Sequence, residues 1–324
     1  MQLKIGVISR LYRSFKKSFV TRVRLWATNV WYGGRSLSSL LYPASLLLRF
    51  AVFVRTKFYE FGLLPVYRAP VPLIVVGNIT VGGSGKTPLV IWLAKFLKAS
   101  GFKPGVICRG CNGSGRWPVI VSDGTEVSAV GDEAILLFRK AGCPVVVGPK
   151  RREAAKILLQ TFDVNVVLSD DGLQHYNLGR DVEIVVVDGE KRFGNGWMLP
   201  AGPLREPRGR IESADLVVIK GEGKDGEIGM SIKTRSIVNI QNPSDYVQPE
   251  FFANTTVNAV SGIGHNESFF RILKKIGINF NARPFPDHYS YSDADLDFGD
   301  QLQIIMTEKD AVKCEKFASE RSWF

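Results

Sequence analysis

Gly85, Lys86 and Thr87 end a glycine-rich turn whose residue types suit the binding of phosphate groups. An apolar run, Val71–Val76, precedes the turn, and a helical pattern from Pro88 to Ser100 follows it. Glycines let backbone N–H groups converge on phosphate oxygens, while the lysine reaches the outer phosphates and the threonine hydroxyl ligates magnesium. The helix N-terminus adds partial positive charge. We therefore predict that a nucleoside triphosphate binds to Thr80, Val81, Gly82, Gly83, Ser84, Gly85, Lys86 and Thr87, although Thr80 stands where the strict G-x-x-x-x-G-K-[ST] pattern has glycine.

Two adjacent carboxylates, Asp170 and Asp171, follow the apolar run Val164–Leu168. A carboxylate at the end of a strand could hold Mg²⁺ together with Thr87. Neighbouring residues in a strand point to opposite faces, so only one of the two contacts the ion unless a turn begins between them. Asp188, at the end of another apolar run, is a rival for the same role. The spacing alone does not decide between Asp188 and the Asp170/Asp171 pair.

Other polar residues have both a structural and a chemical interpretation. Asp132 opens a helical pattern, where an acid favours the helix dipole. His288 lies in a proline-rich aromatic loop, a plausible position for a general base, and His175 follows a strand end. Cys108 and Cys111 have C-x-x-C spacing, but no second pair accompanies them, so we expect reduced thiols.

Short Val/Ile-rich runs alternate with helical stretches through the middle of the chain. This order predicts an α/β fold with a mostly parallel sheet that has helices on both faces, and ligands beyond the carboxyl ends of its strands. The glycine-rich stretch 221–226 suggests a boundary, after which a smaller α/β unit follows. We expect three parts: an N-terminal arm (1–60), a phosphate-binding domain (61–222) and a C-terminal α/β domain (223–324).

The arm carries the whole excess of positive charge. It has eleven basic residues before its first acid, Glu60; without them the 42 basic residues become 31, equal to the 31 acids. Apolar residues from Ile8 to Val30 recur at helical spacing, and a second apolar run, Leu40–Val54, is interrupted by Pro43 and Arg49, which makes it too short to span a bilayer. An amphipathic helix lying on an anionic membrane surface fits this pattern; a helix packed on the domain with a solvated basic face is the alternative.

Other nucleotide-dependent functions fit less well. A GTPase would carry Asn/Thr-Lys-x-Asp, whereas the chain has Thr307-Glu-Lys-Asp310. A nucleic-acid-dependent ATPase has only the basic charge in its favour, which is weak support.

Several segments together resemble one family, the tetraacyldisaccharide 4′-kinases of lipid A synthesis. The resemblance runs from about Leu40 to Lys313. The matching segments, in order, are Val76–Pro88, Gly131–Glu133, Ser169–Tyr176, Arg180–Asp188, Phe193–Pro207, Ser261–His265, Asp287–Tyr289 and Met306–Lys313. The run Phe193–Pro207 is more specific than any phosphate-binding loop, and Thr80 at the first loop position is also similar to the family.

The resemblance implies a Mg²⁺-dependent transfer of the γ-phosphate of ATP to the 4′-hydroxyl of a tetraacylated glucosamine disaccharide 1-phosphate. It implies two α/β/α domains around a cleft and action at the cytoplasmic face of the inner membrane of Gram-negative bacteria, as a peripheral or monotopic protein. Its partners would be the lipid A disaccharide precursor and an anionic membrane surface, with no nucleic acid.

The resemblance also implies roles for individual residues. Lys86 and Thr87 act on the phosphates and the metal, with Asp170 and Asp171 at the metal. Asp132 and His288 take the proton from the sugar hydroxyl; because they lie in different predicted domains, we expect the pair to form only when the cleft closes. The residues that match positions lining the site are Arg151, Gln174, His175, Arg205 and Glu206.

The chief rival is a membrane-recruited P-loop ATPase that acts as a switch. It would share the loop, the metal-binding aspartate and the arm, but it would need neither the run Phe193–Pro207 nor His288. The chain also departs from the family where the pattern Ser-Arg-Gly-Tyr is replaced by Cys108-Arg-Gly-Cys111.

Overall fold

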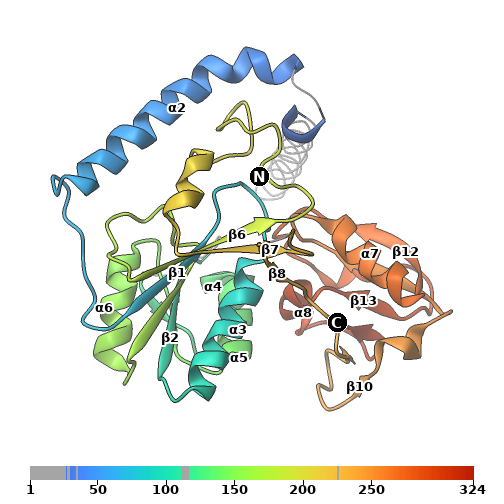
Figure 1. Cartoon of the computed structure of the whole chain (residues 1–324). Coiled ribbons are helices and arrows are strands. Elements are labelled where there is room, and N and C mark those ends of the chain that lie inside the picture. Colours follow the sequence, from blue (N-terminus) through green and yellow to red (C-terminus); the bar gives the residue numbers. More distant parts are fainter. Residues whose placement is uncertain (1–26, 28–29, 34–35, 111–116, 225) are drawn as a thin grey trace, which may run out of the picture. The chain divides into compact units, whose positions relative to one another are not determined.

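An eight-stranded sheet organises residues 73–230 (Figure 1). The structure is a computed structural model that describes residues 27, 30–33, 36–110, 117–224 and 226–324. All neighbouring strands of this sheet are parallel except β3 and β4, so the predicted mostly parallel sheet is confirmed. In spatial order the strands are β3 (Val119–Ile120), β4 (Val145–Val147), β2 (Pro104–Cys108), β5 (Val166–Asp170), β1 (Leu73–Gly77), β6 (Val182–Asp188), β7 (Leu216–Lys220) and β8 (Ile228–Met230).

Helices cover both faces of this sheet. α3 (Lys86–Ala99) and α5 (Asp132–Ala141) share one core with strand residues such as Val106. α6 (Arg151–Thr161) packs on the opposite face. Its Leu158 side chain lies so close to Gly105 of β2 that a Cβ at this glycine would come within 2.8 Å of it. Adjacent strand residues alternate between faces, so Val106 and Gly105 mark the two sides. A short helix, α4 (Val127–Val130), precedes α5.

A second, four-stranded sheet lies in the C-terminal part of the chain, and all its pairings are parallel. Its order is β12 (Asn279–Pro284), β11 (Thr256–Ser261), β13 (Ile304–Met306) and β14 (Ser322–Trp323), with α7 (Asn266–Ile276) and α8 (Glu308–Cys314) beside it. β12, an edge strand with a polar, largely exposed pattern, was not predicted from the sequence. The remaining elements are the pair β9 (Ile237–Val238) and β10 (Tyr246–Val247) and the 3-10 turns η1 (Arg208–Ser213), η2 (Pro249–Phe252) and η3 (Asp293–Asp295).

Contacts divide the chain into two compact units. Unit 1 comprises residues up to 63 together with 79–81 and 189–213. Unit 2 comprises 64–78, 82–188 and 214–324, and therefore contains both sheets. The domain boundaries at 60 and 222 stay predictions.

α2 (Ser36–Glu60) is the long helix of unit 1 (Figure 1). It runs through both Pro43 and Arg49, so the expected interruption of the apolar run is wrong. Its segment Ser38–Glu60 is long and apolar enough to cross a membrane by length and composition, although a single such helix is weak support for a span. The expected amphipathic helix from Ile8 lies almost entirely outside the described residues.

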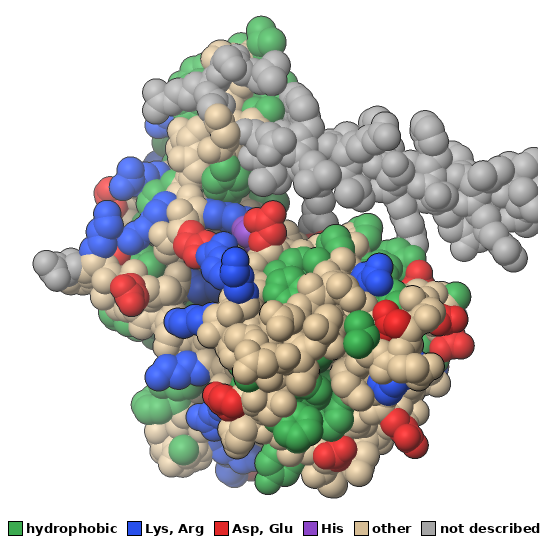
Figure 2. Space-filling model, turned by 90° about the vertical axis from the view of Figure 1, so that its right-hand side faces the viewer, with side chains coloured by type: hydrophobic (Ala, Val, Ile, Leu, Met, Phe, Trp, Pro, Cys, Tyr) green, Lys and Arg blue, Asp and Glu red, His purple; other side chains and the backbone are tan. Residues whose placement is uncertain are grey.

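Most of α2 presents apolar side chains to solvent. Leu40 is 79% exposed, Leu47 73% and Phe50 66%. Figure 2 shows hydrophobic side chains at the surface in the upper part of the view, the height at which α2 lies in Figure 1. An exposed apolar face of this size is typical of a surface that contacts a membrane or a partner.

Candidate active site

The glycine-rich turn connects β1 to α3. Gly82 and Gly85 have φ angles of 112° and 91°, a region that favours glycine, and Gly85 is the N-cap of α3. Thr80 instead forms an antiparallel bridge with Leu204 and is buried. The first position of the loop therefore has an extended conformation that threonine adopts easily, which explains its departure from the strict pattern.

Lys86 points back toward the end of β1. Its Nζ donates to Asn78 Oδ1 at 3.2 Å and lies 3.6 Å from Asp171 Oδ1. Gln174 holds the backbone of Asn78, because its Nε2 donates to the backbone carbonyl oxygen of Asn78 at 3.1 Å. The lysine is thus held at the loop, where a terminal phosphate of a bound nucleotide would lie.

Asp170 and Asp171 both face this loop. Asp170 is the last residue of β5 and its Oδ2 accepts from Thr87 Oγ1 at 3.0 Å. Asp171 has a φ of 49°, so the chain leaves the strand between the two residues. The turn therefore begins between them, the one arrangement that lets both carboxylates reach the same site.

The other carboxylate oxygen of Asp170 fits a metal ion. Oδ1 is buried and, among the described residues, has no hydrogen-bond partner. Burial, helped by Glu133 and opposed by Lys86, raises the pKa of Asp170 to about 6. A buried acceptor-only oxygen beside a threonine hydroxyl suits Mg²⁺, which binds through one or two carboxylates plus substrate phosphates. The described residues contain no cluster of three or more His, Cys, Asp or Glu that could hold a metal by itself.

Asp188, the rival for the metal, lies at the end of β6 on the other side of β1. Its Oδ2 is 3.8 Å from the Lys220 ammonium. The contact with Thr87 belongs to Asp170, which favours Asp170 over Asp188 as the magnesium ligand.

Arg151 holds the end of β5 through side-chain hydrogen bonds to backbone carbonyl oxygens. Its side chain is fully buried and donates to the carbonyl oxygens of Gly148 at 2.8 Å and of Asp170 at 2.9 Å. These bonds hold the backbone that carries the carboxylates.

His175 follows in the turn after Asp171. Its backbone nitrogen donates to the carbonyl oxygen of Gly172, and its own carbonyl oxygen accepts from Arg180.

Asp132 and His288 form a hydrogen-bonded pair in unit 2. His288 Nδ1 lies 3.1 Å and 3.2 Å from the two carboxylate oxygens of Asp132. Asp132 is nearly fully buried at the start of α5, whereas the His288 side chain is 23% exposed in the loop after β12. The structure already holds this pair within hydrogen-bonding distance, although 156 residues separate the two in the sequence.

Charges around the pair set its protonation. Burial raises the pKa of Asp132, but the hydrogen bond from His288 and the nearby charges of Lys309 and Lys313 outweigh it and lower the pKa to about 2. The hydrogen bond to Asp132 raises the pKa of His288 above its usual value, against the effect of burial. An ionised Asp132 accepts a hydrogen bond from the Nδ1–H of His288, which leaves Nε2 as the basic nitrogen of the neutral ring.

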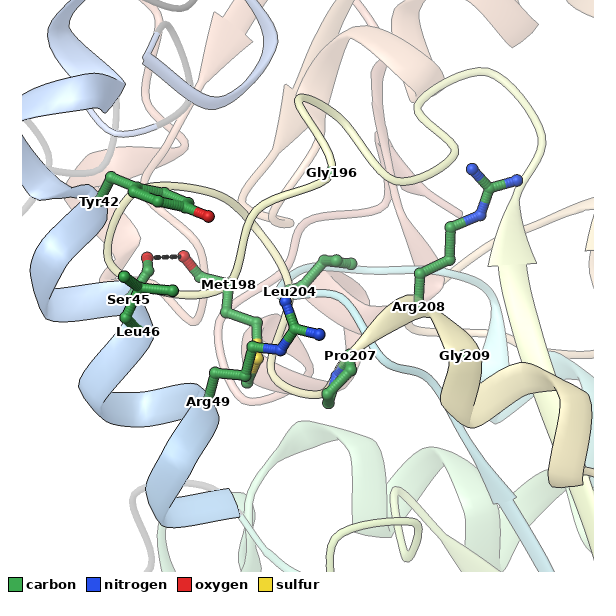
Figure 3. A pocket seen from close by; sticks show the side chains of 10 residues that line it. All are labelled: Tyr42, Ser45, Leu46, Arg49, Gly196, Met198, Leu204, Pro207, Arg208 and Gly209. Carbon is green, nitrogen blue, oxygen red and sulfur yellow. Dashed lines mark hydrogen bonds between the residues drawn. The ribbon is translucent and has the colours of Figure 1, made fainter. Parts of the chain in front are cut away.

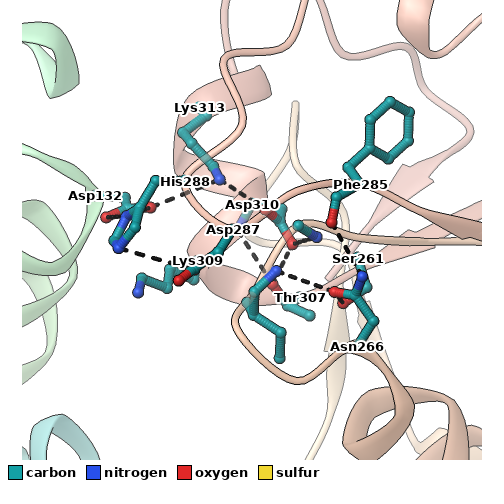
Figure 4. A network of polar contacts seen from close by, with 12 residues as sticks. Asp132, Ser261, Asn266, Phe285, Asp287, His288, Thr307, Lys309, Asp310 and Lys313 are labelled. Carbon is teal, nitrogen blue, oxygen red and sulfur yellow. Dashed lines mark hydrogen bonds and ion pairs between the residues drawn. The ribbon is translucent and has the colours of Figure 1, made fainter. Parts of the chain in front are cut away.

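α8 supplies the lysines of this network (Figure 4). Lys313 Nζ lies 2.7 Å from Asp310 Oδ1 and 3.6 Å from Asp132 Oδ2, and its side chain is 8% exposed. Asp310 in turn accepts from the backbone nitrogen of Gly262 at 2.8 Å, and the Gly262 carbonyl accepts from the backbone nitrogen of His288 at 3.2 Å. One ammonium thus links the acid of the pair to the loop that carries the histidine.

Residues 37–324 match the family described as LpxK, tetraacyldisaccharide-1-P 4′-kinase. The chain belongs to this family. The tetraacyldisaccharide 4′-kinase of Nitrosococcus oceani is 47% identical over 296 residues, which cover 91% of this chain and 87% of that protein. The corresponding protein of Coxiella burnetii is 46% identical over 299 residues, covering 92% and 89%.

Among solved structures, LpxK from Aquifex aeolicus in complex with ATP has a TM-score of 0.75 and 30% identity. The match covers 89% of this chain and 92% of that one. The α/β fold, the kinase class and the use of ATP predicted from the resemblance are therefore confirmed, and the switch ATPase is not favoured.

Two predicted substrate residues of this LpxK family member, Arg205 and Glu206, lie in unit 1 rather than unit 2. The backbone nitrogen of Arg205 donates to Ile79 at 2.7 Å, and Glu206 is buried and pairs with Arg210 at 3.4 Å. Through these contacts and the bridge at Thr80, the family-specific run supports the first half of the phosphate-binding loop. Their contact with a substrate stays a prediction.

Asn78, Lys309 and Lys313 were missed as site residues by the sequence analysis. All three lie inside segments that resemble the family, and that was the available clue. Thr307 begins the segment Thr307–Asp310, which does not match the GTPase signature. Its side chain caps α8 by accepting a hydrogen bond from the backbone nitrogen of Asp310. Cys108 is buried with a pKa raised to about 12 by burial, so it is an unreactive thiol, whereas Cys111 lies outside the described residues.

Proposed function

We propose that this LpxK family member transfers the γ-phosphate of ATP to the 4′-hydroxyl of a tetraacylated glucosamine disaccharide 1-phosphate, with Asp132 and His288 as the pair that accepts the proton. The observation that carries this proposal is the 3.1 Å contact between His288 Nδ1 and Asp132. A switch ATPase needs to position only a water, whereas a sugar hydroxyl is a weak nucleophile that a carboxylate-oriented histidine can activate.

The roles of the residues follow from their contacts. Nε2 of His288 accepts the hydroxyl proton, and Asp132 stabilises the imidazolium that forms. Lys86 neutralises charge on the terminal phosphates. Thr87, Asp170 and Asp171 would hold Mg²⁺, which would reduce the negative charge of the phosphates. Arg151 and Asn78 keep these groups in place through the backbone of β5 and the side chain of Lys86.

We further propose that the protein works at the cytoplasmic face of the inner membrane. The exposed apolar face of α2 and the eleven basic residues before Glu60 support contact with an anionic lipid surface rather than with nucleic acid. The acceptor would then diffuse to the enzyme within the membrane plane.

Transfer of label from γ-labelled ATP to an extracted lipid acceptor tests this function. We expect His288→Ala and Asp132→Asn each to lower turnover by roughly 10²- to 10⁴-fold, the contribution of general base catalysis, while ATP binding stays intact. Turnover near the wild-type rate in both variants would exclude the pair as the proton acceptor. Release of free phosphate without labelled lipid would instead support the switch ATPase.

A further inference from the structure

A pocket of about 240 Å³ lies between α2 and the segment 196–209, entirely within unit 1 (Figure 3). Apolar side chains form most of its wall, among them Leu46, Met198, Leu204 and Pro207. Two guanidinium groups, those of Arg49 and Arg208, also line it, and no carboxylate does. An apolar pocket with positive charge and no acid matches an anion that carries an apolar portion.

Arg49 lies on the face of α2 that packs on this segment. Ser38, Tyr42, Ser45 and Arg49 recur at three- and four-residue spacing, which places them on one side of a helix. The first three make close contacts: Asn195 donates to Ser38, the Tyr42 ring lies 4.7 Å from the ring of Trp197, and Ser45 donates to the Met198 carbonyl. Arg49 continues the row at the point where the packing opens into the pocket.

The Arg49 guanidinium has no ion-pair partner in the part of the chain that the structure describes. Figure 3 shows it extending from α2 toward Met198 and Leu204, while Arg208 rises from the start of η1. Arg208 lies over the Phe193 ring at 4.9 Å. The Arg49 side chain is exposed, so its guanidinium is accessible to an anion from a membrane surface.

We propose that this pocket binds one phospholipid of the membrane surface, with its phosphate against Arg49 and the first carbons of its chains over Leu46, Met198 and Leu204. Guanidinium groups bind phosphate through paired, charge-assisted hydrogen bonds. The volume of 240 Å³ is below the roughly 300–1,000 Å³ of pockets that enclose drug-sized ligands, so it suits the phosphate and first chain carbons of a lipid rather than a whole acylated disaccharide. This proposal rests on the membrane contact of α2 within the proposed function.

Vesicle binding by the full-length protein tests the proposal, with Arg49→Gln compared with Arg55→Gln. Both substitutions remove one charge from α2, but Arg55 lies over the Tyr59 ring and does not line the pocket. On vesicles that contain phosphatidylglycerol but no acceptor, we expect Arg55→Gln to weaken binding about fivefold, the effect of one basic residue near an anionic surface. Arg49→Gln should weaken it at least about tenfold further, since it also removes a charged hydrogen bond. Arg49→Lys, which keeps the charge but loses the paired geometry, should fall between them.

Native mass spectrometry after mild detergent extraction provides a second measurement. We expect one retained phospholipid on the wild type and on Arg55→Gln, and none on Arg49→Gln. Turnover of Arg49→Gln in detergent micelles should stay near wild type, which separates this proposal from a failure of the proposed function. Equal losses in the two glutamine variants, an Arg49 effect seen only with acceptor-containing vesicles, or Arg49-dependent binding of inorganic phosphate alone would each overturn the lipid assignment.

Discussion

At the scale of single residues, the protonation of the Asp132–His288 pair determines when the proposed base can act. Asp132 raises the pKa of His288, and a base must be neutral to accept a proton. Activity should therefore rise with pH through a value above the usual histidine pKa of about 6.5.

The pH profile of Asp132→Asn tests this electrostatic link. Loss of the carboxylate removes the main cause of the raised pKa of His288, so the rising limb of kcat/KM should move to lower pH while the maximal rate falls. A profile measured from pH 5 to 9 checks this. A limb that stays in place would mean that His288 is not the group titrated.

A second prediction at this scale decides between the two candidate metal ligands. Asp170 contacts Thr87, whereas Asp188 lies 3.8 Å from Lys220. We expect Asp170→Asn to raise the Mg²⁺ concentration for half-maximal activity roughly tenfold or more, in line with the loss of one interaction with a charged group. Asp188→Asn should shift it far less. The opposite order, measured by Mg²⁺ titration at saturating ATP, would transfer the role to Asp188.

At the scale of elements, α8 couples the acid of the pair to the loop that carries the base. Lys313 lies between Asp132 and Asp310, and all three side chains are largely buried. Removal of one member of a buried charge network leaves the others uncompensated. The helix therefore contributes to stability and to the geometry of the site through one side chain.

Lys313→Met should lower the free energy of unfolding by about 3–5 kcal/mol and slow turnover. Lys316→Met is the matched control, because Lys316 also pairs with a glutamate but is 80% exposed. Its cost should be about 0–1 kcal/mol. Urea unfolding of the two variants checks the difference, and similar small costs in both would show that Lys313 does not hold the network together.

At the scale of the whole molecule, the exposed apolar surface of α2 should govern association with membranes. Leu47→Ser combined with Phe50→Ser removes two large exposed side chains, each worth about 1.5–3 kcal/mol when buried in an apolar phase. Vesicle binding should fall at least about a hundredfold, because the two losses add.

The exposed pair Trp92 and Phe96 on α3 provides the control for this prediction. Trp92→Ser with Phe96→Ser removes a comparable apolar area from another surface and should leave vesicle binding unchanged. Equal losses in the two double variants, measured by cosedimentation, would show that membrane contact is not concentrated on α2.

Six of the eight strands of the large sheet correspond to Val/Ile-rich runs in the sequence, because buried parallel strands read as continuous apolar runs. The short edge strands β3 and β8 were not predicted. β12 was missed, since an exposed edge strand with Asn279, Asn281 and Arg283 lacks that pattern. The apolar run in α2 was judged too short to span a bilayer, because Pro43 and Arg49 interrupt it in the sequence. The helix nonetheless continues through both residues.

The amino-acid order by itself determined the phosphate-binding turn, the sheet behind it and the acids at the end of β5, because these depend on neighbouring residues and on hydrophobic periodicity. Only the tertiary structure decided that Asp170 contacts Thr87 while Asp171 faces Lys86, since a single left-handed residue reorients the second carboxylate. It also brought Asp132, His288 and Lys313 together and placed Arg49 in a pocket. Contacts between residues far apart in the chain depend on how whole elements pack, and no local pattern encodes that packing.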